Sequence, residues 1–451
     1  MQSFHNSRAP FPFRTMQALM VIACCSVATS PLAAQDASPT VAEDIAPAIE
    51  VDPAMQAAEA ALSAAPVFDG HNDVPIQLRA RFDNQINDLD FDDMTGTGET
   101  HPDGRAMHTD IERLAEGRVG AQYWSVYVPA ALPEPEAVQM TIEQIDVMKR
   151  LIAANPDALR FVETADGVES AMADGRVASL LGMEGGHSIG SSLAVLRQMY
   201  DLGARYMTLT HSRNTPWADS ATDDPEHGGL TDFGRDVVRE MNRIGMLVDL
   251  SHVSEAAMND VLDVASAPVI FSHSGVRAVN GHARNVPDTV LDRLPDNGGI
   301  VMVVALPGFL NEERRQWYAG REAEAARQAS LMLGQPDAIA DAMARWDADN
   351  PEPQTTVSHM ADHIDHIRAH IGVEHIGIGA DFDGMPSGPV GFEDVSGYPE
   401  LFAELSRRGY SRVEMELIAS RNAIRVLREA ERIAARMGDN APIETLIETA
   451  D

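Results

Sequence analysis

Short runs of apolar residues recur along this chain, and each run gives way to polar residues and then to a helical pattern. Alternation of strands with helices predicts a parallel sheet, because neighbouring parallel strands need a crossover connection. Eight such units predict a closed (β/α)8 barrel of the TIM type, with an open doubly wound sheet as the alternative. The eight predicted strands are residues 66–69, 121–128, 178–183, 206–210, 246–250, 268–272, 299–304 and 375–379.

Residues 35–65 lead into this barrel. They begin as a linker rich in Ala, Pro, Asp and Glu and end in a predicted helix, with Asp52 as the N-cap and Pro53 in the first turn. We expect the barrel domain to occupy residues 66–437 and a tail to follow at residues 438–451. The sequence contains no candidate transmembrane span and no short-period repeat.

One connection between predicted strands is unusually long. The segment 307–354, after the seventh strand, exceeds a simple loop and contains Ala-rich turns, so we expect a helical insertion there. Helices close the chain after the eighth strand, and Ser411 with Glu414 forms a capping box at the start of one of them.

Residues 1–34 have the features of an export signal. Arg8 and Arg14 precede an apolar run that is too short to span a bilayer, and small residues follow it up to Ala34, where we place cleavage. The protein is therefore expected to be periplasmic or secreted. Cys24 follows Val-Ile-Ala, which resembles a bacterial lipoprotein box, so a lipid anchor on the membrane surface is the alternative.

Cysteine usage and charge restrict the chemistry further. Cys24 and Cys25 both lie in the signal segment, so cleavage after Ala34 leaves no thiol for a disulfide, a nucleophile or a metal site. The whole chain carries a formal charge of −35, and the signal removes two arginines and no acidic residue, which leaves −37. Such an acidic chain is not expected to bind nucleic acid or an anionic membrane surface.

Residues that can bind metals stand where the predicted strands end. In a (β/α)8 barrel the active site is built from the C-terminal ends of the strands, and six of the eight predicted ends carry His, Asp or Glu. This set predicts two metal ions bridged by a carboxylate, which would lower the pKa of a bridging water enough to make hydroxide at neutral pH. The residues are His71, Asp73, Glu184, His187, His211, His252, His273, Asp381 and Asp383.

A competing motif follows the third predicted strand. Gly186-His187-Ser188-Ile189-Gly190 matches the G-x-S-x-G nucleophile elbow of serine hydrolases, in the context that this motif requires. A serine hydrolase using Ser188 would leave the polar ends of five other strands unexplained, whereas a metal site uses them. We therefore assign Ser188 to the turn after the strand.

Four further histidines lie on one face of a predicted helix near the C-terminus. Their spacing of four, three and four residues places them together, but no Glu follows the first of them as the H-E-x-x-H zinc motif requires. An outer helix of a barrel lies far from the catalytic mouth, so we interpret these side chains as structural or surface residues. They are His359, His363, His366 and His370.

Seven motifs, in order, resemble the renal (membrane) dipeptidase family of the amidohydrolase superfamily. The first is Phe68-Asp69-Gly70-His71-Asn72-Asp73 and the last is Gly379-Ala380-Asp381-Phe382-Asp383-Gly384, so the resemblance covers residues 67–437. The motifs between them are at residues 182–187, 209–219, 249–254, 271–274 and 284–288.

This resemblance implies a dinuclear zinc site with two Zn²⁺ per chain. His71 and Asp73 would bind one ion, His252 and His273 the other, and Glu184 both. The implied reaction is hydrolysis of the peptide bond of free dipeptides by a metal-activated bridging hydroxide. The family is usually dimeric, so the resemblance also implies a homodimer.

The same resemblance assigns roles around the substrate. His211 would bind the carbonyl side and stabilise the tetrahedral intermediate, Arg284 would receive the C-terminal carboxylate, and Asp381 would handle the proton and the amino group. Val304-Ala305-Leu306 departs from an Asn-Phe-Tyr found in some members, which leaves the side-chain preference open. A relative acting on another small amide or lactam, a serine hydrolase and a non-catalytic binding protein are the alternatives.

Overall fold

The computed structural model describes residues 52–99, 101–102 and 104–447. The predicted export signal, the lipoprotein-like Cys24 and most of the linker lie outside the described residues. The nine described strands all pair in parallel. They are β1 Val67–Asn72, β2 Val119–Tyr127, β3 Leu159–Phe161, β4 Val177–Glu184, β5 Ala204–Thr208, β6 Leu247–Asp249, β7 Ile270–Ser274, β8 Ile300–Val303 and β9 Ile376–Ile378.

Eight of the nine strands close into a barrel, which confirms the predicted (β/α)8 fold and excludes the open sheet. Neighbouring strands follow the order β1, β2, β4, β5, β6, β7, β8 and β9, and Asp69 of β1 pairs with Ile378 of β9 to complete the ring. All eight predicted runs are strands of this ring. The remaining strand, β3, lies outside the ring, pairs with the N-terminal end of β4 and is too short to show a sequence pattern.

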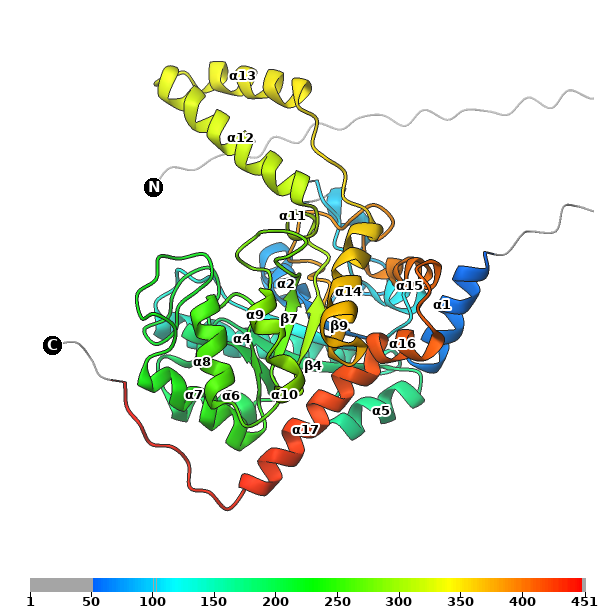
Figure 1. Cartoon of the computed structure of the whole chain (residues 1–451), viewed down its shortest axis with the longest axis vertical. Helices are drawn as coiled ribbons and strands as arrows, with labels where there is room; N and C mark the ends of the chain where they lie inside the picture. The colour runs from blue at the N-terminus through cyan, green and yellow to red at the C-terminus, as the bar shows by residue number, and fades with distance from the viewer. Residues whose placement is uncertain (1–51, 100, 103, 448–451) are drawn as a thin grey trace, which may run out of the picture. The chain divides into compact units, whose positions relative to one another are not determined.

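Helices follow the strands around the outside of the barrel (Figure 1). They are α1 Pro53–Ala64, α2 Val74–Phe82, α3 Ile111–Glu116, α4 Glu134–Ala154, α5 Ala165–Ala173, α6 Leu193–Asp201, α7 Asp232–Ile244, α8 Glu255–Val264, α9 Asp288–Leu291, α10 Leu294–Asn297, α11 Pro307–Leu310, α12 Glu312–Leu331, α13 Pro336–Asp349, α14 Val357–Ile371, α15 Tyr398–Arg407, α16 Arg412–Glu416 and α17 Asn422–Met437. None of these described helices is long and apolar enough to cross a membrane.

The predicted helical insertion is confirmed as α11, α12 and α13, and the last two form a hairpin that extends away from the barrel (Figure 1). Trp317 of α12 packs against Trp346 of α13 with ring centroids 5.8 Å apart. Gln328 is the one buried residue among the twenty of α12, so most of this helix faces solvent. Its first turns, by contrast, begin beside the mouth of the barrel.

Helix starts follow the predicted capping residues. The Asp52 side chain accepts a hydrogen bond from the backbone N–H of Ala54 at the start of α1. At α16, the side chains of Ser411 and Glu414 each bond the other residue's backbone N–H, as a capping box requires.

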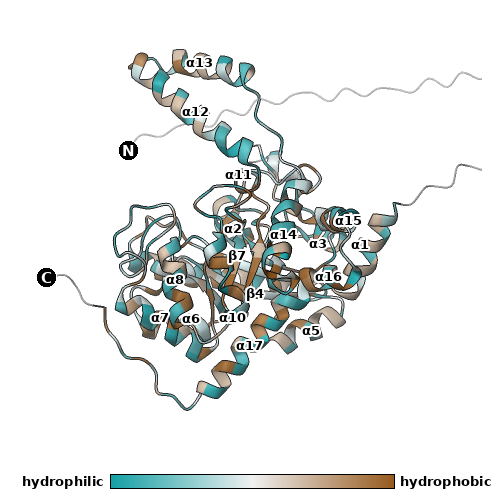
Figure 2. Cartoon of the chain, viewed as in Figure 1, coloured by the Kyte–Doolittle hydropathy of each residue, from teal (hydrophilic) through white to brown (hydrophobic). Residues whose placement is uncertain are grey.

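Aromatic side chains fill the barrel interior. The ring centroid of Tyr123 lies 5.2 Å from that of Phe68 and 4.9 Å from that of Tyr206. A Cβ atom at Gly182 would lie 2.0 Å from Cζ of Tyr206, so this close approach requires glycine. Figure 2 shows hydrophobic brown on the labelled strands β4 and β7. With the interior packed, polar chemistry is confined to the ends of the strands.

Candidate active site

A buried carboxylate holds together the ends of the first and last strands. Asp69 Oδ1 accepts hydrogen bonds from the backbone N–H of His71 and the side chain of Gln122, while Oδ2 accepts from the backbone N–H of Ala380 and the hydroxyl of Tyr398. These four bonds position the segments that carry His71, Asp73 and Asp381. Asp69 is therefore a structural support beneath the site.

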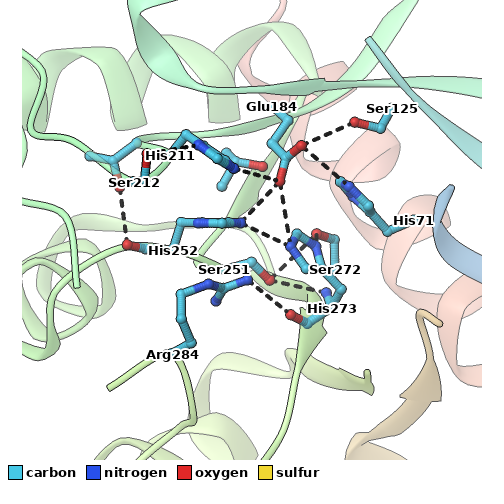
Figure 3. Close-up of polar contacts among 12 residues, drawn as sticks. His71, Ser125, Glu184, His211, Ser212, Ser251, His252, Ser272, His273 and Arg284 are labelled. Atoms are coloured by element: carbon cyan, nitrogen blue, oxygen red, sulfur yellow. Dashed lines mark hydrogen bonds and ion pairs between the residues drawn. The ribbon is translucent and has the colours of Figure 1, made fainter. Parts of the chain in front are cut away.

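The side chains at the strand ends converge on Glu184, at the end of β4 (Figure 3). Its Oε2 lies 3.4 Å from Nε2 of His71. Its Oε1 lies 3.0 Å from Nε2 of His252 and 3.5 Å from Nε2 of His273. One carboxylate thus faces histidines on two sides, as a bridging metal ligand does.

A buried relay sets the tautomer of His273. Asp249 Oδ2 accepts a hydrogen bond of 2.6 Å from Ser272 Oγ, so the Ser272 oxygen is free to accept the Nδ1 proton of His273, 2.8 Å away. Nε2 of His273 then carries only a lone pair and faces the Glu184 carboxylate. Two acceptors that face each other in a buried site are satisfied by a cation between them.

His71 is fully buried, and its ring is held by Tyr206, whose hydroxyl lies 2.8 Å from Nδ1. Its Nε2 lies 3.5 Å from Asp73 Oδ2, so these two residues share one side of the strand end as strand alternation predicts. Burial opposes the charged ring, but Tyr206, Glu184 and Asp73 outweigh it and raise the pKa of His71 well above its usual value. Nε2 of His71 and Oδ1 of Asp73 have no hydrogen-bond partner among the described residues, so a metal ion that displaces the His71 proton would find two ligand atoms here.

The other two histidines of the cluster are kept neutral. Burial, the largest cause, lowers the pKa of both His252 and His273 well below the usual value. Neutral imidazoles with available nitrogen lone pairs are the form that binds a metal. The cluster therefore presents a donor set that fits zinc.

Asp381 stands at the edge of this cluster, in a left-handed backbone conformation with φ of 69°. It could bind the same metal ion as His71 and Asp73, because one donor atom from each of the three lies within 4.8 Å of the others. A Cβ atom at Gly384 would lie 2.1 Å from Asp73 Oδ2 and 2.5 Å from Asp381 Oδ1. Glycine at this position lets both carboxylates approach.

The cluster opens into a cavity of about 400 Å³, within the usual range for small-molecule sites. Arg284 is 2% exposed and lines this cavity. Its hydrogen bonds to Ser274 and the carbonyl of His273 are long, at 3.4 and 3.3 Å, and its Nε has no partner among the described residues. Burial lowers the pKa of Arg284 to about 10, so the guanidinium remains charged at neutral pH and can bind an anion.

His211 lines this cavity beside a predicted ligand: its ring centroid lies 4.2 Å from that of His252 and 4.8 Å from that of Tyr127. Its Nε2 lies 3.9 Å from Glu184 Oε1. Burial lowers the pKa of His211, so at neutral pH the ring keeps one N–H to donate. All eight residues assigned to metal or substrate are thus in one site.

The competing serine motif lies apart from this chemistry. Ser188 is buried in the turn Gly186–Ile189, and its Oγ has no hydrogen-bond partner in the described part of the chain. The neighbouring His187 bonds the carbonyl of Pro129 through Nε2 at 3.2 Å. Neither residue lines the cavity, and no base among the described residues lies within hydrogen-bond distance of Ser188 Oγ.

The four histidines of α14 also lie outside the cavity. His363 is buried, where its Nδ1 accepts from the backbone N–H of Val276 and its Nε2 donates to the carbonyl of Leu310. Burial lowers the pKa of His363 to about 4. His366 and His370 pair with acidic residues of the neighbouring helix segment, and His359 caps its own helix.

Several residues that shape the site were not predicted from the sequence. In the sequence, Tyr206 is only an aromatic residue within a predicted strand, and Ser272 and Asp249 belong to motifs in which they have no assigned role. Tyr127, at the end of β2, lines the cavity beside His211, and burial raises its pKa to about 12. Its place at a predicted strand end was the one available signal.

Comparisons with known proteins identify the family of this chain. A family model described as membrane dipeptidase (peptidase family M19) matches residues 55–441. Dipeptidase 3 of Rattus norvegicus is 41% identical over 386 residues, which is 84% of this chain and 68% of the rat protein. Dipeptidase tcpJ of Claviceps purpurea is 41% identical over 386 residues, or 83% of this chain and 79% of its own length.

Solved structures share the fold. The probable dipeptidase PvdM from Pseudomonas aeruginosa has a TM-score of 0.70 at 24% identity, covering 84% of this chain and 99% of that protein. A metallopeptidase from Rhodobacter sphaeroides, solved with a phosphinate mimic of the dipeptide L-Ala-D-Ala, has a TM-score of 0.64 at 25% identity, with coverage of 81% and 99%.

Proposed function

Because the chain belongs to the membrane dipeptidase family, peptidase family M19, it is a peptide-bond hydrolase, and we propose that it is a zinc-dependent dipeptidase acting on free dipeptides. The observation that carries the proposal is the convergence of His71, His252 and His273 on the two oxygens of Glu184. The phosphinate dipeptide mimic bound to the similar Rhodobacter sphaeroides metallopeptidase supports dipeptides as the substrate class.

We propose that His71 and Asp73 hold one zinc ion, that His252 and His273 hold a second, and that Glu184 binds both. The unpartnered Nε2 of His71 and Oδ1 of Asp73 fit this assignment, and so does the lone pair that the Ser272 relay leaves on His273. When bound there, the two ions supply a water molecule of lowered pKa and polarise the peptide carbonyl.

The remaining groups of the cavity bind and orient the substrate. His211 donates its N–H to the carbonyl oxygen, where negative charge develops during attack. Asp381, beside His71 and Asp73, receives the proton of the attacking water and returns it to the leaving amine. Arg284 binds the free C-terminal carboxylate in a forked arrangement.

Charge recognition at both ends would restrict the substrate to one peptide bond. Arg284 would select the carboxylate, and Asp381, which also lines the cavity, would meet the ammonium group together with the other acidic residues. The test is hydrolysis of a panel of dipeptides, tripeptides and N-acetylated dipeptides, before and after chelation. Cleavage of the free dipeptides alone, lost on chelation, supports the proposal, and equal cleavage of the acetylated forms contradicts it.

We further propose that the protein is exported to the periplasm or secreted, with a lipid anchor at Cys24 as the alternative, and that it forms a homodimer. Mass spectrometry of the mature N-terminus distinguishes cleavage after Ala34 from lipid attachment at Cys24. Light scattering of the purified protein measures the oligomeric state, and a monomeric mass would contradict the dimer.

A further inference from the structure

A second cavity, of about 440 Å³, adjoins the active-site cavity. The two cavities share Leu306 and Phe309 as wall residues. The rest of the second cavity is formed by His282, by α11, by the first turns of α12 and by the loop at Pro386 and Ser387 after β9. We call this second cavity the insertion chamber, because the helical insertion supplies most of its wall.

Apolar and aromatic groups dominate the insertion chamber. Leu306, Pro307, Phe309, Tyr318 and Pro386 all line it. This composition favours an apolar ligand group, because burying apolar surface is favourable and burying an unpaired charge is costly.

Both arginines that line the chamber are already paired. Arg314 forms an ion pair with Glu352 at 2.5 Å, and Arg315 forms one with Glu312 at 2.6 Å. His282 is neutral at neutral pH, since burial and the nearby arginines lower its pKa to about 4. The chamber therefore offers no unpaired arginine to attract an acidic side chain.

Phe309 connects this chamber to the residue that anchors the substrate. Its ring centroid lies 5.5 Å from Cζ of Arg284 and 4.3 Å from the ring centroid of His282. In a dipeptide, the C-terminal carboxylate, which Arg284 would hold, and the C-terminal side chain are attached to the same Cα. That side chain must therefore begin beside the wall that Leu306 and Phe309 form between the two cavities.

We propose that the insertion chamber binds the side chain of the C-terminal residue of the dipeptide and selects bulky apolar or aromatic side chains. This inference rests on the proposed dipeptidase function and adds its specificity. It also gives the helical insertion a role, because residues from the start of α12 complete the chamber.

The test is a substitution that places a large side chain in the chamber from its solvent-exposed side. Ala319 is an exposed residue of α12 that lines the chamber, so Ala319→Trp places bulk there without disturbing a buried residue. The measured quantity is kcat/KM for alanyl-phenylalanine divided by that for alanyl-glycine. We expect Ala319→Trp to lower this ratio about tenfold or more, in line with discrimination by apolar pockets.

Ala329→Trp is the matched control, because Ala329 is exposed on the same helix and lines neither the insertion chamber nor the active-site cavity. It should leave the ratio within about twofold of the wild type, as expected for a surface substitution. If Ala319→Trp folds poorly, Tyr318→Ala provides an independent variant, since it removes an aromatic wall and should lower the same ratio.

The outcomes separate this inference from the function on which it rests. A ratio unchanged in both chamber variants overturns the inference while leaving the dipeptidase intact. The inference would also be overturned if the chamber variants lost activity on phenylalanyl-alanine and kept it on alanyl-phenylalanine. The N-terminal side chain would then be the one that occupies the chamber. Failure of the wild type to cleave any dipeptide would reject the proposed function itself.

Discussion

Replacing Arg284 by alanine removes a buried cation from the wall of the active-site cavity. Arg284 is 2% exposed, and its Nε has no partner among the described residues. Its two hydrogen bonds within the protein, of 3.4 and 3.3 Å, are longer than good charge-assisted bonds. Its capacity to bind a carboxylate is therefore largely unused by the protein itself.

The size of the effect follows from this geometry. A hydrogen bond to a charged group contributes about 1.5–3 kcal/mol, and about 1.36 kcal/mol corresponds to a tenfold change in rate. Arg284→Ala should therefore lower kcat/KM for free dipeptides roughly 10- to 150-fold. Both metals should remain, because arginine is not a ligand.

The assay compares each dipeptide with its C-terminally amidated form. Wild-type enzyme should strongly prefer the free acid, since the amide offers no negative charge. Arg284→Ala should show little preference, and Arg284→Lys should retain part of it, because lysine keeps the charge but not the forked geometry. If wild type and Arg284→Ala have the same preference ratio, Arg284 is not the carboxylate anchor.

Three further predictions concern other parts of the site and fold. Ser188→Ala should keep most dipeptidase activity in a kinetic assay, and covalent labelling of Ser188 by an acylating substrate would instead favour a serine hydrolase. Ser272→Ala should weaken zinc binding about 10- to 100-fold, because it breaks the relay that orients His273; unchanged affinity in a chelator competition would contradict this. Burial lowers the pKa of His363 from an ordinary 6.5 to about 4, so the unfolded chain binds an extra proton between these pH values. The contribution of His363 to the free energy of unfolding should therefore fall by about 2 kcal/mol from pH 7 to pH 5. His363→Gln should lose that part of the pH dependence in urea unfolding at both pH values, and an unchanged dependence would refute the assignment.

The barrel and its catalytic face could be predicted because both leave local signals. Each barrel strand is an apolar run, and residues such as His71 and Asp381 follow directly where a run ends. Once the strands form a closed ring, their ends must meet, so residues distant in sequence come together. The short β3 had no comparable signal, because three residues do not show a period.

The supporting residues could not be predicted in the same way. Tyr206 lies inside a strand and resembles any core aromatic, and its contact with His71 depends on the space above Gly182. The link between Asp249 and Ser272 depends on the pairing of β6 with β7. The insertion chamber likewise arises only from the position of α12 beside the barrel mouth.

The most direct test of the dinuclear site is the zinc content of purified wild-type protein and of Glu184→Ala, measured by elemental analysis alongside dipeptidase activity. We expect about two zinc ions per wild-type chain, as the bridging carboxylate requires, with activity that is lost on chelation and restored by zinc. Glu184→Ala should bind markedly less zinc and be inactive. A wild-type protein that is fully active without metal, or a Glu184→Ala variant that retains both ions, would contradict the account.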